Sequence, residues 1–484
     1  MGRLFGRKTI FLVLILGIAV FYNANRVLPV GISTRSSTAE VTPSSVVFLK
    51  DTTYVDESGV RHSEQEIFDT ALSLIQGAEK YILLDMFLYN DFQGENPETY
   101  RALSSELTDA LLLKKTAYPD MPIYVVSDPI NMIYGGYISP HFEELEAAGI
   151  DVVITDLTQL RDSNPLYASF WRLFVQWFGN STEGRLPNPF IAHGPGVSLR
   201  SYLSLLNFKA NHRKVLVVDY PHQDRESWAT LITSANPHDG SSAHENVGIL
   251  VFGDSTAEAV LKSEQAVGDF SGKEIILPDF NDSEVSQGDV SVTVVTEEKI
   301  RDAVLYAINT TQPDDRIDLV MFYLADREVV RALKDALGRG VSVRLVLDPN
   351  KDAFGRKKNG VPNRPVASEL TNAHNGAQVR WCDTHGEQCH SKLIIVQSKD
   401  TYTLILGSAN MTRRNIGDFN LETNIVVESE GLIPAISEAY DYIETIWNNE
   451  DGNIYTSDYH TYADERKIMY GLYRVMEASG LSSF

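Results

Sequence analysis

Two spacings of apolar side chains alternate along most of this chain. Residues 63–80 carry apolar positions three or four residues apart, which predicts an amphipathic helix. Residues 81–90 then form a short, almost continuous apolar run, which is typical of a buried strand. A predicted helix over 101–113 and a predicted strand over 122–129 continue the series. Helices that alternate with short strands predict an α/β fold.

The second half of the chain repeats this order. Helical spacing over 296–311 precedes an apolar run at 317–326, as in the first half. A second helical segment at 327–340 precedes another run at 341–349. A whole series that recurs in one order predicts an internal duplication.

Short motifs also recur in register between the two halves. HRKVLVVD is answered by HSKLIIVQ, and each is followed by a turn of small residues, TSAN or GSAN. We therefore expect two similar domains, residues 46–288 and 289–484, with a boundary near Gly288. The motif copies are His212–Asp219 and Thr233–Asn236 in the first domain, and His390–Gln397 and Gly407–Asn410 in the second.

The His-x-Lys spacing at the start of each long motif indicates a specific chemistry. Successive side chains of a strand point to opposite faces, so His212 and Lys214 are expected to share one face. His390 and Lys392 are expected to do the same in the second domain. An imidazole beside a fixed ammonium suits phosphate, which needs a nucleophile or proton donor together with a charge clamp.

Further paired residues near the motifs suit supporting roles. The turns supply neutral donors for phosphate oxygens, the serines being weaker candidates than the asparagines: Asn236, Asn410, Ser234 and Ser408. A carboxylate follows each turn, Glu245 and Glu422, and a carboxylate on one ring nitrogen orients an imidazole and stabilises its charged form. Asp219 and Gln397 lie an odd number of positions after their histidines, so we interpret them as scaffold residues that face away from the reaction.

These residues resemble the signature of the phospholipase D superfamily, His-x-Lys-x4-Asp followed by a small-residue Asn turn and an acidic residue. The resemblance extends from about Val46 to Trp447, and Gln397 departs from the signature. It implies two similar α/β halves, each a mixed sheet flanked by helices, packed about a pseudo-twofold axis with one shared active site. Within the superfamily, the chain looks similar to bacterial phospholipases D and cardiolipin synthase-like proteins.

The resemblance also implies a two-step displacement at phosphorus without a metal or another cofactor. By similarity, His212 is the nucleophile that forms a phosphohistidine, and His390 is the general acid. The sequence alone does not distinguish the two histidines, because the motifs are symmetric. No zinc-like clustering of histidine with cysteine accompanies them, since the chain has two cysteines and His390 is already assigned.

The N-terminus carries an apolar run that suits export or anchoring. Residues 10–22 are apolar and follow three basic residues, and the run is short for a full membrane span. We interpret residues 1–25 as a signal peptide or a short uncleaved anchor. The positive charge ahead of the run predicts that the catalytic part lies on the extracytoplasmic side. Residues 26–45 are interpreted as a linker to the first strand.

An aromatic insertion near residues 160–190 makes the first half longer than the second. Its aromatic residues recur at helical spacing and predict a single stripe. They are Phe170, Trp171, Phe174, Trp177 and Phe178. The stripe is either packed core or a lid, or an interfacial helix that enters the headgroup layer of a membrane.

The two cysteines, Cys382 and Cys389, flank a short loop. They form either a disulfide, which suits an exported domain, or two free thiols. A loop this short would gain roughly 2–3 kcal/mol of stability from a disulfide on the chain-entropy model. Because Cys389 adjoins His390, oxidation would act next to a functional residue.

The charge of the chain bears on which partners it binds. A formal net charge of −23 opposes general capture of nucleic acid or of an anionic membrane. We expect an enzyme that acts on phospholipid at a membrane surface, either a phospholipase D or a phosphatidyltransferase. The alternative is a membrane-anchored or exported nuclease, with nucleic acid as its partner. A noncatalytic binding protein ranks third, because neither motif has lost its histidine or lysine.

Overall fold

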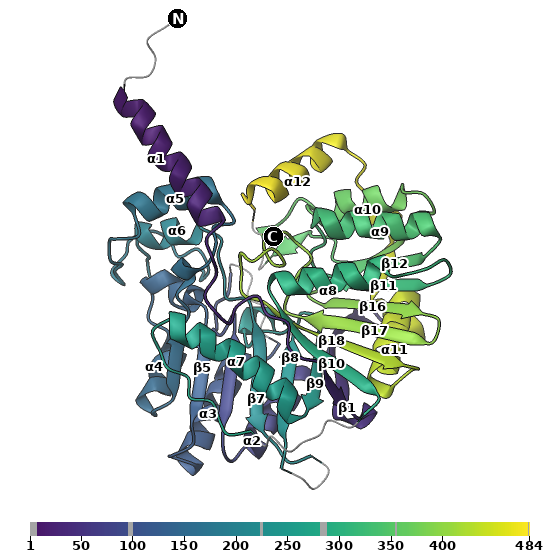
Figure 1. Cartoon of the computed structure of the whole chain (residues 1–484), viewed down its shortest axis with the longest axis horizontal. Helices are drawn as coiled ribbons and strands as arrows, with labels where there is room; N and C mark the ends of the chain where they lie inside the picture. The colour runs from purple at the N-terminus through teal and green to yellow at the C-terminus, as the bar shows by residue number, and fades with distance from the viewer. Residues whose placement is uncertain (1–6, 95–99, 223–225, 281–287, 354–355, 483) are drawn as a thin grey trace, which may run out of the picture.

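A computed structural model of the chain describes residues 7–94, 100–222, 226–280, 288–353, 356–482 and 484. It contains two large mixed β-sheets, each flanked by helices (Figure 1). The helices and strands expected from the apolar spacing are present in both halves, although their ends shift by a few residues. The predicted α/β fold with two similar halves is confirmed.

The first sheet has the strand order β3-β2-β9-β8-β7-β4-β5-β6. Its pairs are antiparallel from β3 to β4, and β4, β5 and β6 are parallel. The strand bounds are β2 Val46–Val55, β3 Arg61–Gln65, β4 Ile82–Met86, β5 Ile123–Ser127, β6 Asp151–Ile154, β7 Lys214–Asp219, β8 Trp228–Thr233 and β9 Asn246–Phe252.

The second sheet has the order β1-β10-β18-β17-β16-β11-β12-β15-β19. From β10 to β15 it repeats, strand for strand and direction for direction, the first sheet from β2 to β6. A small ribbon of β13 and β14 stands apart from it. The bounds are β1 Ala39–Val41, β10 Val290–Thr296, β11 Arg316–Met321, β12 Ser342–Leu347, β13 Asp352–Ala353, β14 Arg356–Lys357, β15 Gln378–Cys382, β16 Lys392–Ser398, β17 Thr401–Gly407, β18 Thr423–Glu430 and β19 Thr456–Asp458.

The helices form an outer layer on each sheet and close the space between the sheets. α2, α3 and α4 bury one face of the first sheet, and α8, α9 and α10 bury the corresponding face of the second. α7 contacts β10 of the other half, and its counterpart α11 contacts β2. The bounds are α1 Arg7–Ala24, α2 Ile67–Gly77, α3 Leu103–Ala117, α4 Pro140–Ala147, α5 Pro165–Phe174, α6 Leu199–Leu205, α7 Asp254–Phe270, α8 Glu298–Asn309, α9 Arg327–Arg339, α10 Asn363–Thr371, α11 Pro434–Asn448 and α12 Lys467–Ser479.

A central apolar core joins the two sheets. It contains inward-facing residues of β7 and β9, such as Val215 and Ile249, together with Leu393, Leu406 and Ile425 of the second sheet. Strands β8 and β9 contact β17 across this core. Because burial of apolar area drives such packing, the two halves form one body with their motif strands facing each other.

The segment interpreted as a linker, residues 26–45, is corrected by the structure. It contains β1, which pairs with β10 and so adds an edge strand to the second sheet. An extra backbone bond runs from Ser36 N to Val294 O (2.9 Å). The N-terminal segment therefore crosses to the second half before the chain enters β2.

The N-terminal run forms helix α1, which projects from the body near α5 (Figure 1). Among the residues that the structure describes, no helix combines the length and the apolar character that crossing a membrane requires. The signal or anchor interpretation of residues 1–25 stays a prediction.

The aromatic insertion does not form one uniform stripe. α5 ends at Phe174, so Trp177 and Phe178 lie after the helix. Trp171 is buried and stacks under Arg200, whose guanidinium carbon lies 4.9 Å from a ring centroid. Phe170 and Phe174 are about half exposed, whereas Trp177 and Phe178 are 76% and 69% exposed. Core packing is therefore correct for Trp171, and an apolar surface is formed by the others.

Candidate active site

The two motif histidines lie where the halves meet. Each occupies an extended segment two residues before its strand, and Lys214 and Lys392 are the first residues of β7 and β16. His212 N donates to Leu421 O of the second half (2.9 Å). His390 N donates to Glu245 O of the first half (2.8 Å). Each strand therefore begins at the motif lysine and not, as expected, at the histidine, because both histidines bond to the backbone of the opposite half.

Both motif lysines are buried beneath their histidines. Lys214 Nζ donates to His212 O at 2.7 Å, and Lys392 Nζ donates to His390 O. Each ammonium also lies over an aromatic ring, Lys214 over Phe87 (5.0 Å to the centroid) and Lys392 over Phe322 (5.3 Å). Burial lowers the pKa of Lys214 to about 7 and that of Lys392 well below its usual value, with the other ammonium contributing at Lys392. A bound anion would relieve this cost, so the site suits phosphate.

Charged groups of both motifs act on each of the two histidines. Burial lowers the pKa of His212 to about 4 although the Glu422 carboxylate raises it, and Lys214 and Lys392 lower it further. Burial also holds the pKa of His390 well below its usual range, with Lys392, His244, Lys214 and His212 acting in the same direction. Each histidine also bonds to the backbone of the opposite half, so both motifs lie at one interface.

Glu422 orients His212 across the interface, although the residues are far apart in sequence. His212 Nδ1 lies 2.9 Å from Glu422 Oε1 and 3.0 Å from Oε2, and the carboxylate is fully buried. Ser408 Oγ donates to Oε2 at 2.5 Å, and Asn415 Nδ2 donates to Oε1. The carboxylate therefore holds the Nδ1 proton and directs Nε2 away from itself.

The interpretation of Glu245 as the second orienting carboxylate is wrong. The acceptor for His390 Nδ1 is Asn246 Oδ1, at 3.1 Å. An isolated backbone β-bridge pairs Glu245 with Cys389, the residue before His390, and another pairs Leu421 with Asn211, the residue before His212. Glu245 therefore corresponds to Leu421, and Asn246 corresponds to Glu422. The acidic residues Glu245 and Glu422 are therefore offset by one position between the halves. One position on a strand reverses the face, so Glu245 points elsewhere.

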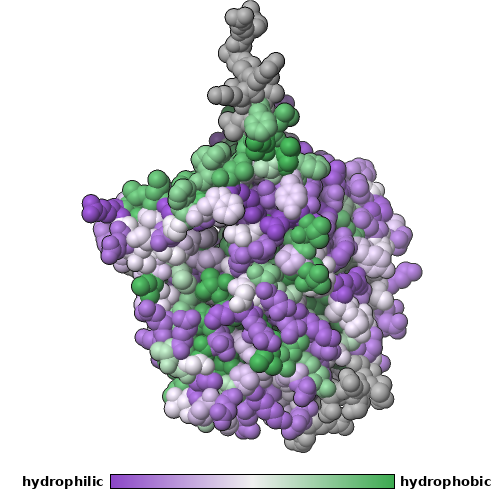
Figure 2. All heavy atoms as spheres, turned by 60° about the vertical axis from the view of Figure 1, so that its left-hand side comes forward, coloured by the Kyte–Doolittle hydropathy of each residue, from purple (hydrophilic) through white to green (hydrophobic). Residues whose placement is uncertain are grey.

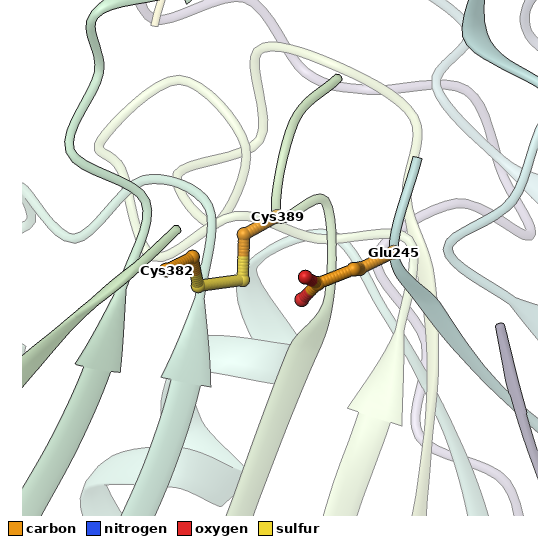
Figure 3. A group of neighbouring side chains, drawn as sticks. All are labelled: Glu245, Cys382 and Cys389. Atoms are coloured by element: carbon orange, nitrogen blue, oxygen red, sulfur yellow. A yellow bond between two sulfur atoms is a disulfide. The ribbon is translucent and has the colours of Figure 1, made fainter. Parts of the chain in front are cut away.

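Glu245 points instead to the disulfide between Cys382 and Cys389 (Figure 3). The disulfide alternative for these cysteines is therefore the one present. Burial raises the pKa of the Glu245 carboxyl well above its usual range, and Glu387, Asp348 and Asp383 add to the effect. Glu245 and the two sulfur atoms have ligand-like spacing, but the sulfurs are bonded to each other and offer no thiolate to a metal.

The serines of the two turns do not point to a phosphate. Ser234 Oγ donates to Asn246 Oδ1 (3.0 Å), and Ser408 Oγ donates to Glu422. Each also accepts a backbone N–H at 3.0 Å, from Val247 and Thr423 respectively. The proposed phosphate contact of the serines is corrected to support of the orienting residues.

The asparagines of the turns differ in their partners. Asn236 Oδ1 accepts from Leu88 N at 3.2 Å, which leaves its amide nitrogen for a ligand. Asn410 is buried, and its Oδ1 has no hydrogen-bond partner among the described residues. Both remain candidates for the phosphate oxygens, Asn410 after rotation of its amide or through its nitrogen.

Asp219 and Gln397 lie at the far ends of β7 and β16. Asp219 accepts the backbone N–H groups of residues 79–81, with distances of 2.8 Å to Lys80 and Tyr81. Gln397 Nε2 donates to Tyr402 OH at 3.4 Å. Asp219 joins two segments of the first half, whereas Gln397 contacts the neighbouring strand.

Two aspartates position the histidines and had not been assigned a role. Asp128 Oδ2 accepts from Asn211 N at 2.7 Å, one residue before His212. Asp348 Oδ2 accepts from Cys389 N at 3.0 Å, one residue before His390. The repeated Asp-Pro pair was visible in the sequence, but its partners were not. These carboxylates hold the backbone from which each imidazole projects.

A buried ion network links the first motif to Glu422. Arg213, between the motif histidine and lysine, donates to Glu264 at 2.9 Å and to Glu297 Oε1 at 2.8 Å. The same Glu297 oxygen accepts Glu422 N at 3.0 Å. His212 and its orienting carboxylate are therefore positioned by one shared anchor between the halves.

Comparisons with known proteins agree with this architecture. Residues 304–447 match the family model described as "Cardiolipin synthase, PLD-like domain". The structure is similar to phosphatidylserine synthase from Haemophilus influenzae Rd KW20, with a TM-score of 0.55, 10% identity, and coverage of 96% of this chain and 97% of that chain. It also aligns with Nuc, a phospholipase D family member from Salmonella typhimurium, with a TM-score of 0.27, 24% identity, and coverage of 35% of this chain and 97% of that chain. No match was found among curated proteins.

Proposed function

We propose that this chain, which is assigned to the phospholipase D superfamily by its family match over residues 304–447 and its fold, cleaves or transfers the phosphodiester group of membrane phospholipids. It is a phosphodiesterase or phosphatidyltransferase of that superfamily. The observation that carries the proposal is the paired arrangement of the two motifs. Each imidazole is held through Nδ1, beside a buried ammonium, at one interface.

The proposed reaction has two steps. His212 Nε2 attacks phosphorus, the bond from phosphorus to the leaving oxygen breaks, and His390 Nε2 gives its proton to that oxygen. His390 then takes a proton from water or an alcohol, whose oxygen attacks phosphorus. The bond between phosphorus and His212 Nε2 breaks, and its electron pair returns to that nitrogen. Lys214, Lys392 and the turn asparagines stabilise the charge on the nonbridging oxygens.

An exposed apolar surface supports a lipid substrate. Apolar side chains gather where α1 meets the body of the molecule (Figure 2). α1 contacts α5, and the exposed Trp177 and Phe178 follow α5 in the chain. In α12 the side chains of Ile468 and Val475 are 76% and 64% exposed, whereas Tyr473 of the same helix is buried. Soluble monomers rarely expose apolar patches on several neighbouring elements without a partner.

These elements converge next to the candidate active site. Asp162 N, just before α5, donates to Asn23 O in α1 at 3.1 Å. Gly480, which ends α12, lies so near Ser163 that a Cβ there would be 1.9 Å from the Ser163 carbonyl oxygen. Arg414, four residues after Asn410, donates to Gly480 O at 2.8 Å. A bilayer on this surface would lie beside the turn that carries Asn410.

The substrate class can be tested with labelled phosphatidylglycerol, phosphatidylcholine and single-stranded DNA. We expect the full chain to release or transfer the phosphatidyl group of at least one lipid and to leave the DNA intact. Product identification with and without added glycerol separates hydrolysis from transfer. Cleavage of DNA without turnover of lipid would replace the proposal with the nuclease alternative.

The membrane contact can be tested with the double variant Trp177→Ser and Phe178→Ser. We expect weaker binding to lipid vesicles and slower turnover of vesicle lipid, because two interfacial rings are lost. Turnover of a soluble phosphodiester and the melting temperature should be nearly unchanged, since both rings are exposed. Tyr306→Ser, at a 65% exposed residue of α8, is the matched control and should change none of these readings. Equal losses on soluble and vesicle substrates would contradict the membrane contact.

A further inference from the structure

The two histidines are held by the same geometry but by groups of different charge. Glu422 and Asn246 occupy corresponding positions, and each accepts from an Nδ1 and from a turn serine. One partner is a carboxylate and the other is a neutral amide. The pseudo-twofold symmetry of the site is therefore broken in charge at the atoms that orient the imidazoles.

The Asn246 amide has one orientation that satisfies its neighbours. Its Nδ2 donates to His244 O at 3.0 Å, which directs Oδ1 toward His390. Ser234 Oγ accepts the Val247 N–H, so its own hydrogen is directed to Asn246 Oδ1. Since Oδ1 can only accept, the proton on His390 must sit on Nδ1. His390 Nε2 is then the ring atom that exchanges a proton with a ligand.

The charge difference has opposite effects on the two steps that the histidines could perform. Attack by Nε2 leaves a positively charged phosphoimidazolium, which a carboxylate on Nδ1 stabilises. Proton donation removes a positive charge from the ring, and a carboxylate on Nδ1 would oppose it. A neutral amide keeps the ring oriented without this opposition, so it suits the proton donor.

We infer that Asn246 is a positioning residue that makes His390 the acid of the pair, while Glu422 makes His212 the nucleophile. This inference rests on the proposed function. It assigns the roles from the two orienting groups, where the motifs themselves are symmetric. In the first step the proton leaves His390 Nε2 for the leaving oxygen, and the other ring proton stays on His390 Nδ1, where it is donated to Asn246 Oδ1. In the second step Nε2 recovers a proton from the attacking water or alcohol.

The groups that face His390 all favour proton release. Lys392 from β16, Lys214 from β7, and His244 and His212 from the preceding segments oppose positive charge on the ring. Asp348 bonds the backbone before His390 and Glu245 faces the disulfide. An aspartate at position 246 would place a carboxylate beside Nδ1, and this carboxylate would favour positive charge on the ring.

Asn246→Asp tests the inference on a soluble alkyl phosphodiester, through the dependence of kcat/KM on pH. The acid must be protonated, so activity falls as pH rises through its pKa. A carboxylate raises that pKa, and we expect the alkaline limb to move upward by about 1–3 pH units. Glu245→Gln is the matched control at the adjacent residue, because the Glu245 carboxyl points to the disulfide and not to the His390 ring. We expect both limbs of its profile to stay in place.

Asn246→Ala adds a test through the leaving group. A nitrophenolate leaves without a proton, whereas an alkoxide requires one. We expect the variant to lose at least roughly tenfold more activity on the alkyl ester than on the nitrophenyl ester, which is part of the roughly 10²–10⁴-fold that a general acid contributes. A merely structural defect would lower both rates equally and would overturn the inference.

Histidine NMR separates failure of this inference from failure of the proposed function, because it needs no turnover. In the wild type we expect neutral His390 to carry its proton on Nδ1, and in Asn246→Asp we expect its pKa to rise. A neutral ring with its proton on Nε2, an unchanged pKa, or movement of the acidic limb alone would overturn the inference. These readings decide it even if the protein turns over DNA and not lipid.

Discussion

Replacing His212 or His390 by alanine is expected to lower turnover of an alkyl phosphodiester by a factor on the order of 10⁴ or more. In the proposed mechanism nucleophile and acid act in one displacement, so the double variant should lose little beyond either single variant. Each imidazole is held by a residue of the opposite half, His212 by Glu422 and His390 by Asn246, so we expect neither motif to form a complete site alone. Steady-state kinetics on the three variants measure the effect.

The phosphorylated residue distinguishes the two histidines. With a nitrophenyl ester, His390→Ala should still form the phosphoenzyme and should release it slowly, because its base for the second step is missing. Mass spectrometry of the quenched protein should find the phosphate on His212. Phosphate on His390 in the wild type would reverse the roles, and full turnover by His390→Ala would refute a shared site.

Glu422→Gln is expected to lower kcat by roughly 10²–10⁴, since a neutral amide at this position can present the wrong hydrogen-bonding atom to His212 and no longer stabilises the phosphoimidazolium. Gln397→Asp is the matched control at the far end of the second motif strand. It should keep activity within a few-fold, because Gln397 contacts Tyr402 and not a histidine.

The two variants also differ in what contradicts them. A large loss in Gln397→Asp with an unchanged melting temperature would refute the scaffold interpretation of Gln397. Nearly full activity in Glu422→Gln would remove the carboxylate from the mechanism. Glu422 is fully buried and bonded to Asn415 and Ser408, so circular dichroism should accompany the kinetics to exclude unfolding.

The order of helices and strands along the chain and the motif chemistry could be predicted because they depend on local spacing. Apolar periodicity reports which face of a strand or helix is buried, and each half carries its own complete pattern. The duplication follows from that, whereas the shared spatial order of the strands from β2 to β6 and from β10 to β15 was seen only in the structure. The pairing of β1 with the second sheet could not be predicted, because a three-residue strand has too little pattern to identify its partner.

Which residue orients each of the two histidines could not be predicted from the sequence. Glu245 and Glu422 matched by chemical type, but the backbone bridges align Glu245 with Leu421 and Asn246 with Glu422. The loops before these positions differ in length, so two residues of the same chemical type do not occupy the same position on their strands. Because a strand has a period of two, an offset of one residue reverses the face of the side chain.

The sequence by itself determined that the protein has two similar α/β halves, each with a histidine and a lysine suited to phosphate. Only the tertiary structure decided that Glu422 serves His212 and that Asn246 serves His390, because each partner comes from the opposite half. Contacts across 210 and 144 residues depend on how two sheets pack, and local spacing does not encode them. The difference in charge between the groups that orient the two histidines is therefore a property of the assembled interface.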